Sequence, residues 1–490
     1  MSNRDLLTNP CWSKKDLGEA LPDSIHAVSV ALPTWEDVID YEEKKTSCIQ
    51  KLKSIYPRFG FNPLISQIAK LACDLNYFEE CTAWPYPNLT TAKKAELFCK
   101  SKFKFCETKI ENILGLYCLI VSSNSTSAAK AFWQHTGLGA SSRLAAISLG
   151  LESEPAKIDG EEAKNSLKER LADLYTCNPN NITLYPSGMA AMETALSLIT
   201  HLRPNKPSLQ VGFPYVDVLK LPKVIFQGGS LILKSNSENL KKEIDDLSPA
   251  AVIVELPSNP MLQCVDLPKI AKIAHDKGIP VIADDTIGSA WNIDALPYAD
   301  LIFSSLTKSF AGRGDILSGS LVISPYSIWR DDFRKQLPGS ISTELSDPDA
   351  IELEIASRDF CERMPRLNES CIKLKNHLES HPEVSRVLHP ESCSNFSKLM
   401  KSGRGYGCLL SFELRGGVNN AKKFYNQLEV CKGPSLGTNF TLVCPYVLLA
   451  HYNELDWAED CGVPRHLLRV SVGLEDPNDL WVRFRKALNL

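Results

Sequence analysis

A repeated pattern of short apolar runs and longer amphipathic stretches in the middle of the chain predicts a β-sheet covered by helices. Residues 251–255 (AVIVE) and 280–283 (PVIA) have the length and apolar composition of buried strands. Between them, apolar residues recur at helical spacing, and we expect a helix that begins after Asp266 as N-cap and ends at Gly278. A strand, a helix and a strand in this order form a βαβ unit, so the sheet should be parallel and covered on both faces.

The same periodicities predict further elements along the chain. We expect strands at 117–121, 182–184, 209–211, 301–303, 321–323 and 406–414, and helices from 164 to about 177, at 190–201, at 350–366 and at 367–380. The longest apolar run, 113–121, is too short to span a bilayer and is interpreted as a buried strand. The chain is predicted to have four parts, namely an N-terminal arm (1–70), a segment of mixed pattern (71–165), a large α/β domain (166–326) and a smaller C-terminal α/β domain (327–490).

Composition and charge narrow the classes of function. The 490 residues are enough for two or three domains with large cores. With 54 basic and 58 acidic residues the net charge is −4, which gives no electrostatic case for a nucleic-acid or membrane partner. The 16 cysteines include no C-x-x-C pair and no cluster with zinc spacing, so we expect reduced, mostly buried thiols and no metal site. Residues 1–20 lack the apolar core of a signal peptide, which favours a cytoplasmic protein.

Polar residues stand where two of the predicted strands end. Asp284 and Asp285 follow one strand, at the carboxyl edge where open α/β sheets bind ligands. Lys308 follows the next strand, after Ser305 and Thr307, whose hydroxyls can hydrogen-bond a phosphate. A lysine beside cationic or polarising groups has a lowered pKa and can attack a carbonyl, as a Schiff base with pyridoxal phosphate requires. A Ser/Thr/Lys cluster alone is more often a solvated loop, but the carboxyl pair upstream favours the functional interpretation.

A small-residue turn between a predicted strand and a predicted helix is a second candidate phosphate site. Ser187, Gly188 and Met189 occupy this turn. The geometry directs backbone N–H groups and the positive end of the helix dipole at a phosphate. Gly188 permits a close approach, and the Ser187 hydroxyl could donate one more hydrogen bond.

Three motifs in a fixed order carry a resemblance to a known family. They are 255–260 (ELPSNP), 284–286 (DDT) and 305–308 (SLTK). Together they resemble the Cys/Met-metabolism family of pyridoxal-phosphate enzymes, typified by cystathionine γ-synthase, whose members carry Glu-Ser-Pro-Ser-Asn-Pro, Asp-Asn-Thr and Ser-x-Thr-Lys. The order and spacing of three motifs are more specific than any one of them. The stretches 27–43 and 131–143 resemble the cystathionine γ-synthase-like proteins of fungi.

This resemblance implies an α/β protein of PLP-dependent fold type I (aspartate aminotransferase-like), with a mostly parallel sheet in the large domain and pyridoxal 5′-phosphate as cofactor. Lys308 would carry the cofactor as a Schiff base and move protons, and Asp284 would keep the ring nitrogen protonated. Tyr215 matches the family tyrosine that stacks on the pyridine ring and takes part in proton transfer. The expected cofactor contacts also include Ser187, Gly188, Met189, Ser305, Thr307, Tyr56 and Arg58.

The match at Tyr56 and Arg58 (YPRFGFNP, 56–63) concerns the cofactor phosphate. In the family a Tyr-x-Arg in the N-terminal arm reaches the phosphate of the neighbouring subunit, which implies a homodimer or homotetramer with shared active sites. Arginine suits this task because its planar fork grips a dianion in two places. Segment 71–165 departs from the family pattern and ends at Arg143, which competes with Arg58 for the same role.

Substrate contacts are implied in the C-terminal part. Residues 469–476 (RVSVGLED) resemble the family's Arg-x-Ser-x-Gly-x-Glu-Asp, in which the arginine binds the substrate α-carboxylate, so Arg469 is the candidate here. An arginine inside an apolar run would be costly if it were buried without an anion. Ser435 in a Ser-Leu-Gly stretch and Asn259 in the first motif are expected in the same pocket.

The motif set favours a transferase that carries out γ-replacement on an O-acyl-L-homoserine, as in trans-sulfuration. Several alternatives remain open: γ-replacement with a carbon or nitrogen nucleophile in a specialised pathway, a β- or γ-lyase of the same family, a binding protein that has lost catalysis, and an aminotransferase. Retention of Lys308 and Asp284 disfavours the binding protein, and the Ser-Gly-Met and Ser-x-Thr-Lys contexts disfavour the aminotransferase.

Overall fold

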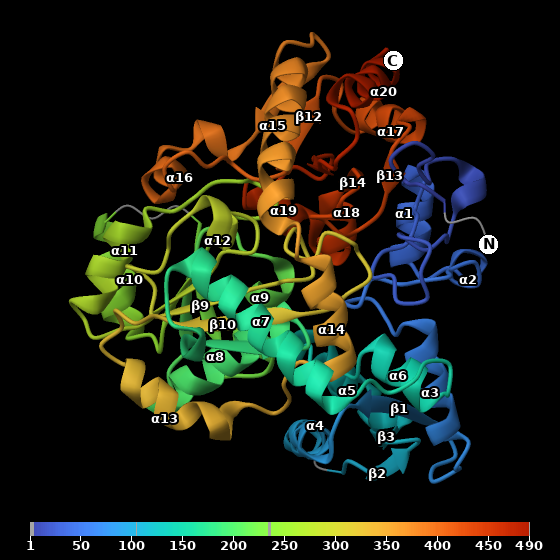
Figure 1. The fold of residues 1–490 in the computed structure, drawn as a ribbon, viewed down its shortest axis with the longest axis vertical. Helices are drawn as coiled ribbons and strands as arrows, with labels where there is room; N and C mark the ends of the chain where they lie inside the picture. The colour runs from blue at the N-terminus through green and yellow to red at the C-terminus, as the bar shows by residue number, and fades with distance from the viewer. Residues whose placement is uncertain (1–3, 104, 234–236, 490) are drawn as a thin grey trace.

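The computed structural model describes residues 4–103, 105–233 and 237–489, and its fold is shown in Figure 1. The strands of this described part form three sheets, with seven strands in a large central domain, five in the C-terminal domain and three in a small N-terminal module. The C-terminal domain stands above the large domain in Figure 1, and the module lies beside it. The N-terminal arm runs along the C-terminal domain toward the module. As expected, the chain has an α/β fold with a mostly parallel large sheet and a separate C-terminal domain.

The large sheet has the strand order β4-β10-β9-β8-β7-β5-β6. Strands β5 to β9 pair in parallel, whereas β10 is antiparallel to both β9 and β4. Val252 and Val254 of β7 pack into one apolar core and Ile253 packs into another, so the sheet is covered on both faces. The elements are α7 (Lys157–Tyr175), β4 (Ile182–Tyr185), α8 (Gly188–Leu202), β5 (Ser208–Val211), α9 (Val216–Val224), β6 (Gly229–Ile232), α10 (Ser237–Leu247), β7 (Val252–Glu255), α11 (Leu267–His275), β8 (Val281–Asp284), α12 (Ser289–Asn292), β9 (Leu301–Ser304) and β10 (Gly319–Ile323).

Two helices that follow β10 still pack on the large domain. Helix α13 (Arg330–Ser340) lies against α8, and α14 (Asp347–Ala356) lies along α7. The C-terminal domain then has the strand order β11-β12-β15-β14-β13. Its elements are α15 (Phe360–Glu379), β11 (Val384–Leu388), α16 (Ser394–Leu399), β12 (Leu409–Leu414), α17 (Gly417–Gln427), β13 (Cys431–Lys432), β14 (Leu442–Pro445), α18 (Tyr446–Ala450), α19 (Leu455–Asp460), β15 (Leu468–Ser471) and α20 (Pro477–Leu488).

The N-terminal module shares a core with the large domain. Its antiparallel sheet has the order β1-β3-β2, and its elements are α3 (Pro63–Cys73), β1 (Cys81–Tyr86), α4 (Leu89–Lys102), β2 (Thr108–Ile113), β3 (Leu116–Ser122), α5 (Thr126–Thr136) and α6 (Ser142–Ser148). One face of the sheet packs on α3 and α6. The other face belongs to the apolar core that also contains α8 of the large domain, as Leu119 of β3 and Ala195 of α8 illustrate. The module is therefore fixed against the helix that begins at the candidate phosphate turn.

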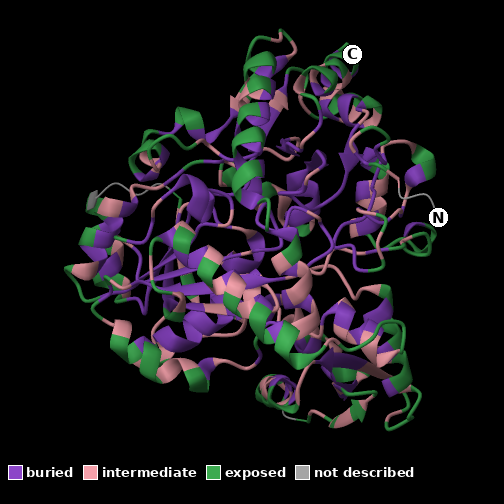
Figure 2. Cartoon of the chain, in the orientation of Figure 1, coloured by how far each residue is buried: buried purple, intermediate pink, exposed green. Residues whose placement is uncertain are grey.

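The arm is tied to the C-terminal domain by contacts between residues far apart in sequence. It contains the helices α1 (Trp35–Glu42) and α2 (Thr46–Ile49). The Tyr425 hydroxyl donates to the Leu32 carbonyl at 2.8 Å. The Lys432 ammonium, which is fully buried, donates to the Pro33 carbonyl at 2.9 Å. Figure 2 shows buried residues running through the arm where it meets this domain. Among the described helices, none combines the length and apolarity that crossing a bilayer requires.

The sequence-based element boundaries are mostly confirmed, with two corrections. Helix α11 lies between β7 and β8, as predicted, with Asp266 at its N-cap. The apolar run 113–121 is not one strand, because β2 ends at Ile113 and β3 begins at Leu116 after a turn of two residues with positive φ. The predicted break between helices at 366 and 367 is also wrong, since α15 runs through it and the helices separate at 357–359.

Candidate active site

A cavity opens where the arm, the module, the large domain and the C-terminal domain meet. Its lining contains nearly all of the site residues that the sequence predicts: Tyr56, Arg58, Ser187, Gly188, Met189, Tyr215, Asn259, Asp284, Ser305, Thr307, Lys308 and Arg469. Ser435 is buried beside it, between the lining residues Pro434 and Leu436. Residues that are more than 400 positions apart in sequence thus face one cavity.

Lys308 lies in the loop after β9 and is 9% exposed. Its ammonium donates a hydrogen bond to the Tyr56 hydroxyl at 3.2 Å. Burial alone would raise the pKa of Tyr56, but the polar groups around it, chief among them the positive charge of Lys308, together hold this pKa below its usual value. The amine and the phenol therefore form a pair that can share a proton.

Asp284 ends β8 at the carboxyl edge of the sheet. It is 5% exposed, and its Oδ1 accepts the Thr286 N–H at 2.9 Å. Burial raises the pKa of Asp284 to about 6. Asp285 faces away, where it accepts a hydrogen bond from the Tyr175 hydroxyl at 2.8 Å, and burial raises its pKa to about 7. Of these two aspartates only Asp284 is among the residues that line the cavity, so it is the one that can meet a positively charged ligand atom.

The candidate phosphate turn is confined on two sides. The Ser187 hydroxyl caps α8 by accepting the Ala190 N–H at 3.0 Å and donates to the Gly137 carbonyl of the module at 2.9 Å. A Cβ on Gly188 would lie 2.8 Å from the Ser305 Cβ, so only glycine fits this approach. We expected the Ser187 hydroxyl as a free donor, but it already has two protein partners. The groups that this turn can still offer to an anion are therefore chiefly the N–H groups at the start of α8.

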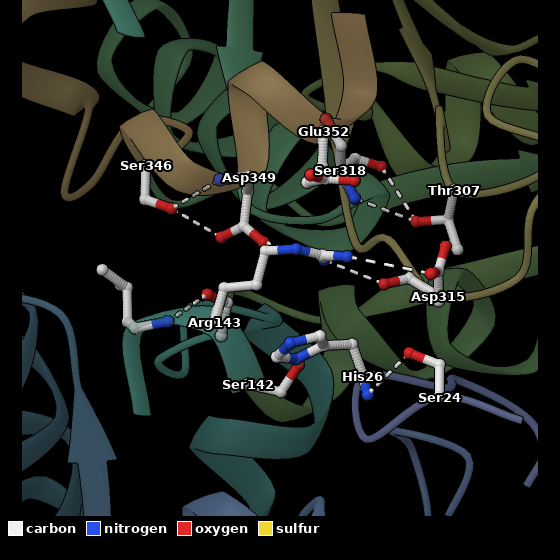
Figure 3. Close-up of polar contacts among 12 residues, drawn as sticks. Ser24, His26, Ser142, Arg143, Thr307, Asp315, Ser318, Ser346, Asp349 and Glu352 are labelled. Carbon is white, nitrogen blue, oxygen red and sulfur yellow. Dashed lines mark hydrogen bonds and ion pairs between the residues drawn. The ribbon is translucent and has the colours of Figure 1, made fainter. Parts of the chain in front are cut away.

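The Thr307 hydroxyl is engaged in a similar way. It donates to the Ser318 carbonyl at 3.2 Å and accepts the Ser318 N–H at 2.9 Å. Figure 3 shows this pair beside the contacts of Arg143. The Arg143 guanidinium donates to the Asp315 carbonyl at 2.8 Å and lies 3.5 Å from Asp349 Oδ1. Arg143 thus fixes the loop that follows Lys308.

Tyr56 and Arg58 enter the cavity of their own chain. We expected from the family resemblance that they would reach a neighbouring subunit. The Arg58 guanidinium donates to the Leu449 carbonyl at 2.5 Å, and its Nε lies 3.7 Å from Asp217 Oδ2. Of the two competing arginines, Arg58 lines the cavity, whereas Arg143 is held in the cluster of Figure 3.

Arg469 lies on β15 and is 3% exposed. Its Nη2 donates to the carbonyls of Pro434 and Ser435, each at 2.8 Å, and its Nη1 lies 3.4 Å from Asn259 Oδ1. These acceptors are neutral oxygens, and Nε is buried without a hydrogen-bond partner in the described part of the chain. A buried cation with neutral partners and a free donor is suited to bind an anion.

Sequence reasoning missed two groups of residues around the cavity. Asp217 lies in the stretch that contains Tyr215 but was given no role, and it is 3.1 Å from His135 Nδ1 of the module. Glu255 was only part of a motif, yet its Oε2 accepts the N–H groups of Tyr215 at 2.8 Å and Asn259 at 3.2 Å. The signal that could have found Glu255 is its place at the end of an apolar strand, the criterion that identified Asp284. Asp217 lies in the first turn of α9, where this criterion does not apply.

Comparisons with known proteins agree with this geometry. Residues 160–489 match the family model described as Cys/Met metabolism PLP-dependent enzyme. The cystathionine gamma-synthase of Neurospora crassa is 29% identical over 97% of this chain and 98% of its own length. A cystathionine gamma-synthase-like protein of Aspergillus thermomutatus, ankD, is 30% identical over 95% of this chain and 93% of its own length.

A solved structure supports the fold. The crystal structure of metB from Corynebacterium glutamicum superposes with a TM-score of 0.60 and 26% identity, over 69% of this chain and 88% of that one. The superposition covers about as much of this chain as the family model does, and the region that the family model matches begins after the module. The chain therefore belongs to the Cys/Met metabolism family of pyridoxal-phosphate-dependent enzymes, and pyridoxal 5′-phosphate is its cofactor.

Proposed function

We propose that this protein is a transferase that carries out γ-replacement on an O-acyl-L-homoserine. The observation that carries the proposal is that Lys308, Asp284 and Arg469 line one cavity. They are an amine that can move protons, a carboxyl at the sheet edge and a buried cation that has no anionic partner among the described residues. This set matches an amino-acid substrate whose reaction needs successive proton transfers.

The residues of the cavity fit pyridoxal phosphate. The turn at Gly188 leaves room for backbone rather than side chain, as a phosphate held by N–H groups requires. Arg58 lines the cavity and is the cation that would bind the cofactor phosphate. Asp284 would meet the ring nitrogen. When bound, the cofactor supplies an electron sink that stabilises negative charge at the substrate Cα and Cβ.

The chain's own residues then control protons and orientation. Lys308 would remove the Cα proton, pass it on, and then remove the Cβ proton, so that the carboxylate of the γ-ester leaves with the bonding electrons. A nucleophile would then add at Cγ, and protons returned to Cβ and Cα would complete the product. Its hydrogen bond to Tyr56 at 3.2 Å gives the amine a phenolic partner for proton exchange. Arg469 would hold the substrate α-carboxylate through its free Nε and so orient the Cα proton.

One observation favours a second candidate, namely γ-replacement with a nucleophile other than cysteine. The arm and the module close one end of the cavity with aromatic side chains. The Phe61 ring lies 4.8 Å from Trp133 and 5.1 Å from Trp84, and both Phe61 and Trp133 line the cavity. An apolar aromatic wall favours a carbon acid or an amine with an apolar body over a small charged amino acid.

The test uses the holoenzyme with O-acetyl-L-homoserine in deuterated water. Without an acceptor, we expect both the Cα and Cβ protons to exchange and 2-oxobutanoate and ammonia to form slowly. Addition of cysteine, sulfide, a carbon acid or an amine should then give a γ-adduct that mass spectrometry identifies. Lys308→Ala should abolish both exchanges.

Other outcomes separate the alternatives. Rapid 2-oxobutanoate formation with no adduct from any acceptor would identify a lyase. Exchange at Cα alone, with neither 2-oxobutanoate nor adduct, would contradict γ-replacement and favour an aminotransferase.

A further inference from the structure

A histidine of the arm lies in the lining of the cavity with a hydrogen-bond partner on each ring nitrogen. His26 and Ser142 both line the cavity. His26 Nδ1 lies 2.9 Å from Ser142 Oγ of α6, and His26 Nε2 lies 2.7 Å from Glu152 Oε1. His26 is 6% exposed, whereas the Glu152 side chain is 38% exposed. A serine, a histidine and a carboxylate thus follow one another from the cavity toward the surface, and Figure 3 shows the Ser142 hydroxyl beside the His26 ring.

The serine and the histidine are both held by the loop that follows the reactive lysine. The backbone N–H of Val28 donates to the Gly314 carbonyl at 2.9 Å. The Arg143 guanidinium donates to the Asp315 carbonyl at 2.8 Å. These two contacts tie the chain near the histidine and the residue after the serine to one loop. The pair therefore has a fixed place relative to the part of the chain that carries the amine.

The carboxylate determines where the imidazole carries its proton. An ionised carboxylate only accepts hydrogen bonds, so His26 Nε2 must donate to Glu152. In the neutral imidazole Nδ1 is then an acceptor, and the Ser142 hydroxyl donates to it. The hydroxyl oxygen keeps its lone pairs for a group in the cavity. In this arrangement a serine oxygen can receive a proton while its own proton passes to the histidine.

We propose that Ser142 and His26 together form the base that takes the proton of the acceptor nucleophile, and that Glu152 orients the imidazole. The inference rests on the proposed γ-replacement and deepens it, because an acceptor X–H must lose its proton when X bonds to Cγ. That proton passes to Ser142 Oγ as the Ser142 proton passes to His26 Nδ1, and the Glu152 carboxylate stabilises the imidazolium. After the product leaves, the reverse transfers release the proton to water.

The proposal assigns a task to the N-terminal part of the chain. All three residues precede residue 160, where the match to the family model begins. The base that they form serves the acceptor, whereas Lys308 serves the amino-acid substrate. The acceptor class that needs such a base is a thiol, an amine or a carbon acid that binds with its proton, and an anion without a proton does not need it.

The first test needs no substrate. The full-length protein is labelled with ¹⁵N-histidine, and the NMR signals of His26 are assigned through His26→Gln. At about pH 7.5 we expect a neutral ring with its proton on Nε2. Ser142→Ala should shift the Nδ1 signal, and Glu152→Gln should shift the Nε2 signal. An imidazolium, or a neutral ring with its proton on Nδ1, would overturn the proposal, because neither can accept the Ser142 proton at Nδ1.

The second test separates the acceptor side from the amino-acid side of the reaction, with O-acetyl-L-homoserine at the same pH. Cysteine brings a proton on its thiol, which is mostly un-ionised at about pH 7.5. His26→Gln and Ser142→Ala should lower the ratio of cysteine-adduct formation to Cα proton exchange about 100-fold, because only the first of these uses the base. With azide, an anion that brings no proton, the same ratio should fall far less.

Two neighbouring residues supply matched controls. Ser141→Ala removes the hydroxyl that caps α6, and Glu154→Gln changes an exposed carboxylate. Neither residue is among those that line the cavity, and neither substitution should change the histidine signals or the ratio. An equal loss with cysteine and azide, or an unchanged ratio in folded variants, would overturn the proposal. A wild type without Cα exchange would contradict γ-replacement itself, whereas the histidine spectrum reports the protonation of His26 in either case.

Discussion

The buried carboxyl of Asp284 is suited to a bound cofactor, but it should lower the folding stability of the protein when the cofactor is absent. Its pKa in the folded protein is about 6, above the usual value near 4, so the folded chain holds this proton more tightly than the unfolded chain. Stability of the cofactor-free protein should therefore fall as pH rises from about 4 to about 6 and stay lower above that.

Asp284→Asn should remove this loss. At pH 8 we expect the cofactor-free variant to be more stable than the cofactor-free wild type by about 1–3 kcal/mol, and at about pH 3.5 we expect the two to be nearly equal in stability. Chemical unfolding at the two pH values measures the difference, with the exposed Asp276→Asn as control. Equal stability at both pH values would show that Asp284 is not the responsible group.

At the scale of single residues, the sequence predicts the position of those residues that have a recognisable strand or motif next to them in the chain. Lys308 and Asp284 follow apolar strands, and short motifs surround them, so their place at the sheet edge was predictable. The contact between His135 and Asp217 was not, because it depends on how the module packs on α8 and α9. The engagement of the Ser187 hydroxyl by Gly137 escaped prediction for the same reason.

At the scale of elements, the end of α5 and the start of α8 are packed too closely for a side chain between them. Gly137 caps α5 with φ +63°, and a Cβ there would lie 2.3 Å from Ser187 Oγ and 2.9 Å from Met189 Cβ. Gly137→Ala should displace the phosphate turn and weaken cofactor binding about 10-fold or more. Gly150 has a similar φ of +71°, and no atom of the described chain lies within 4 Å of a Cβ placed there, so Gly150→Ala carries the backbone strain without the clash.

Titration of each cofactor-free variant with pyridoxal phosphate checks this prediction. Gly150→Ala should lose about 1 kcal/mol of stability and bind the cofactor as the wild type does. If both variants bind equally well, the module does not support the turn.

The element boundaries themselves were mostly predictable, since β7, α11 and β8 follow their apolar periods, whereas the hairpin between β2 and β3 was hidden in a continuous apolar run.

At the scale of the whole molecule, the arm brings Tyr56 and Arg58 to the cavity of the same chain. The family resemblance favours a homodimer or homotetramer, and we predict that in this chain the sites are not shared. A mixture of Arg58→Ala and Lys308→Ala chains should therefore regain no activity, because every site lacks one of the two residues. Subunit exchange must be shown with tagged chains. Recovery of up to a quarter of wild-type activity would mean that the arms cross between subunits.

The distance in sequence between the arm and its anchor has a consequence for synthesis. Leu32 and Tyr425 are 393 residues apart. At about 5–20 residues per second, the arm waits roughly 20 to 80 seconds on the ribosome before its partner exists. The large domain can fold in that interval with Lys308 in place, but Tyr56 cannot be held beside it until the C-terminal sheet has been made. Assembly of the active site is therefore one of the last steps in the folding of the newly synthesised chain.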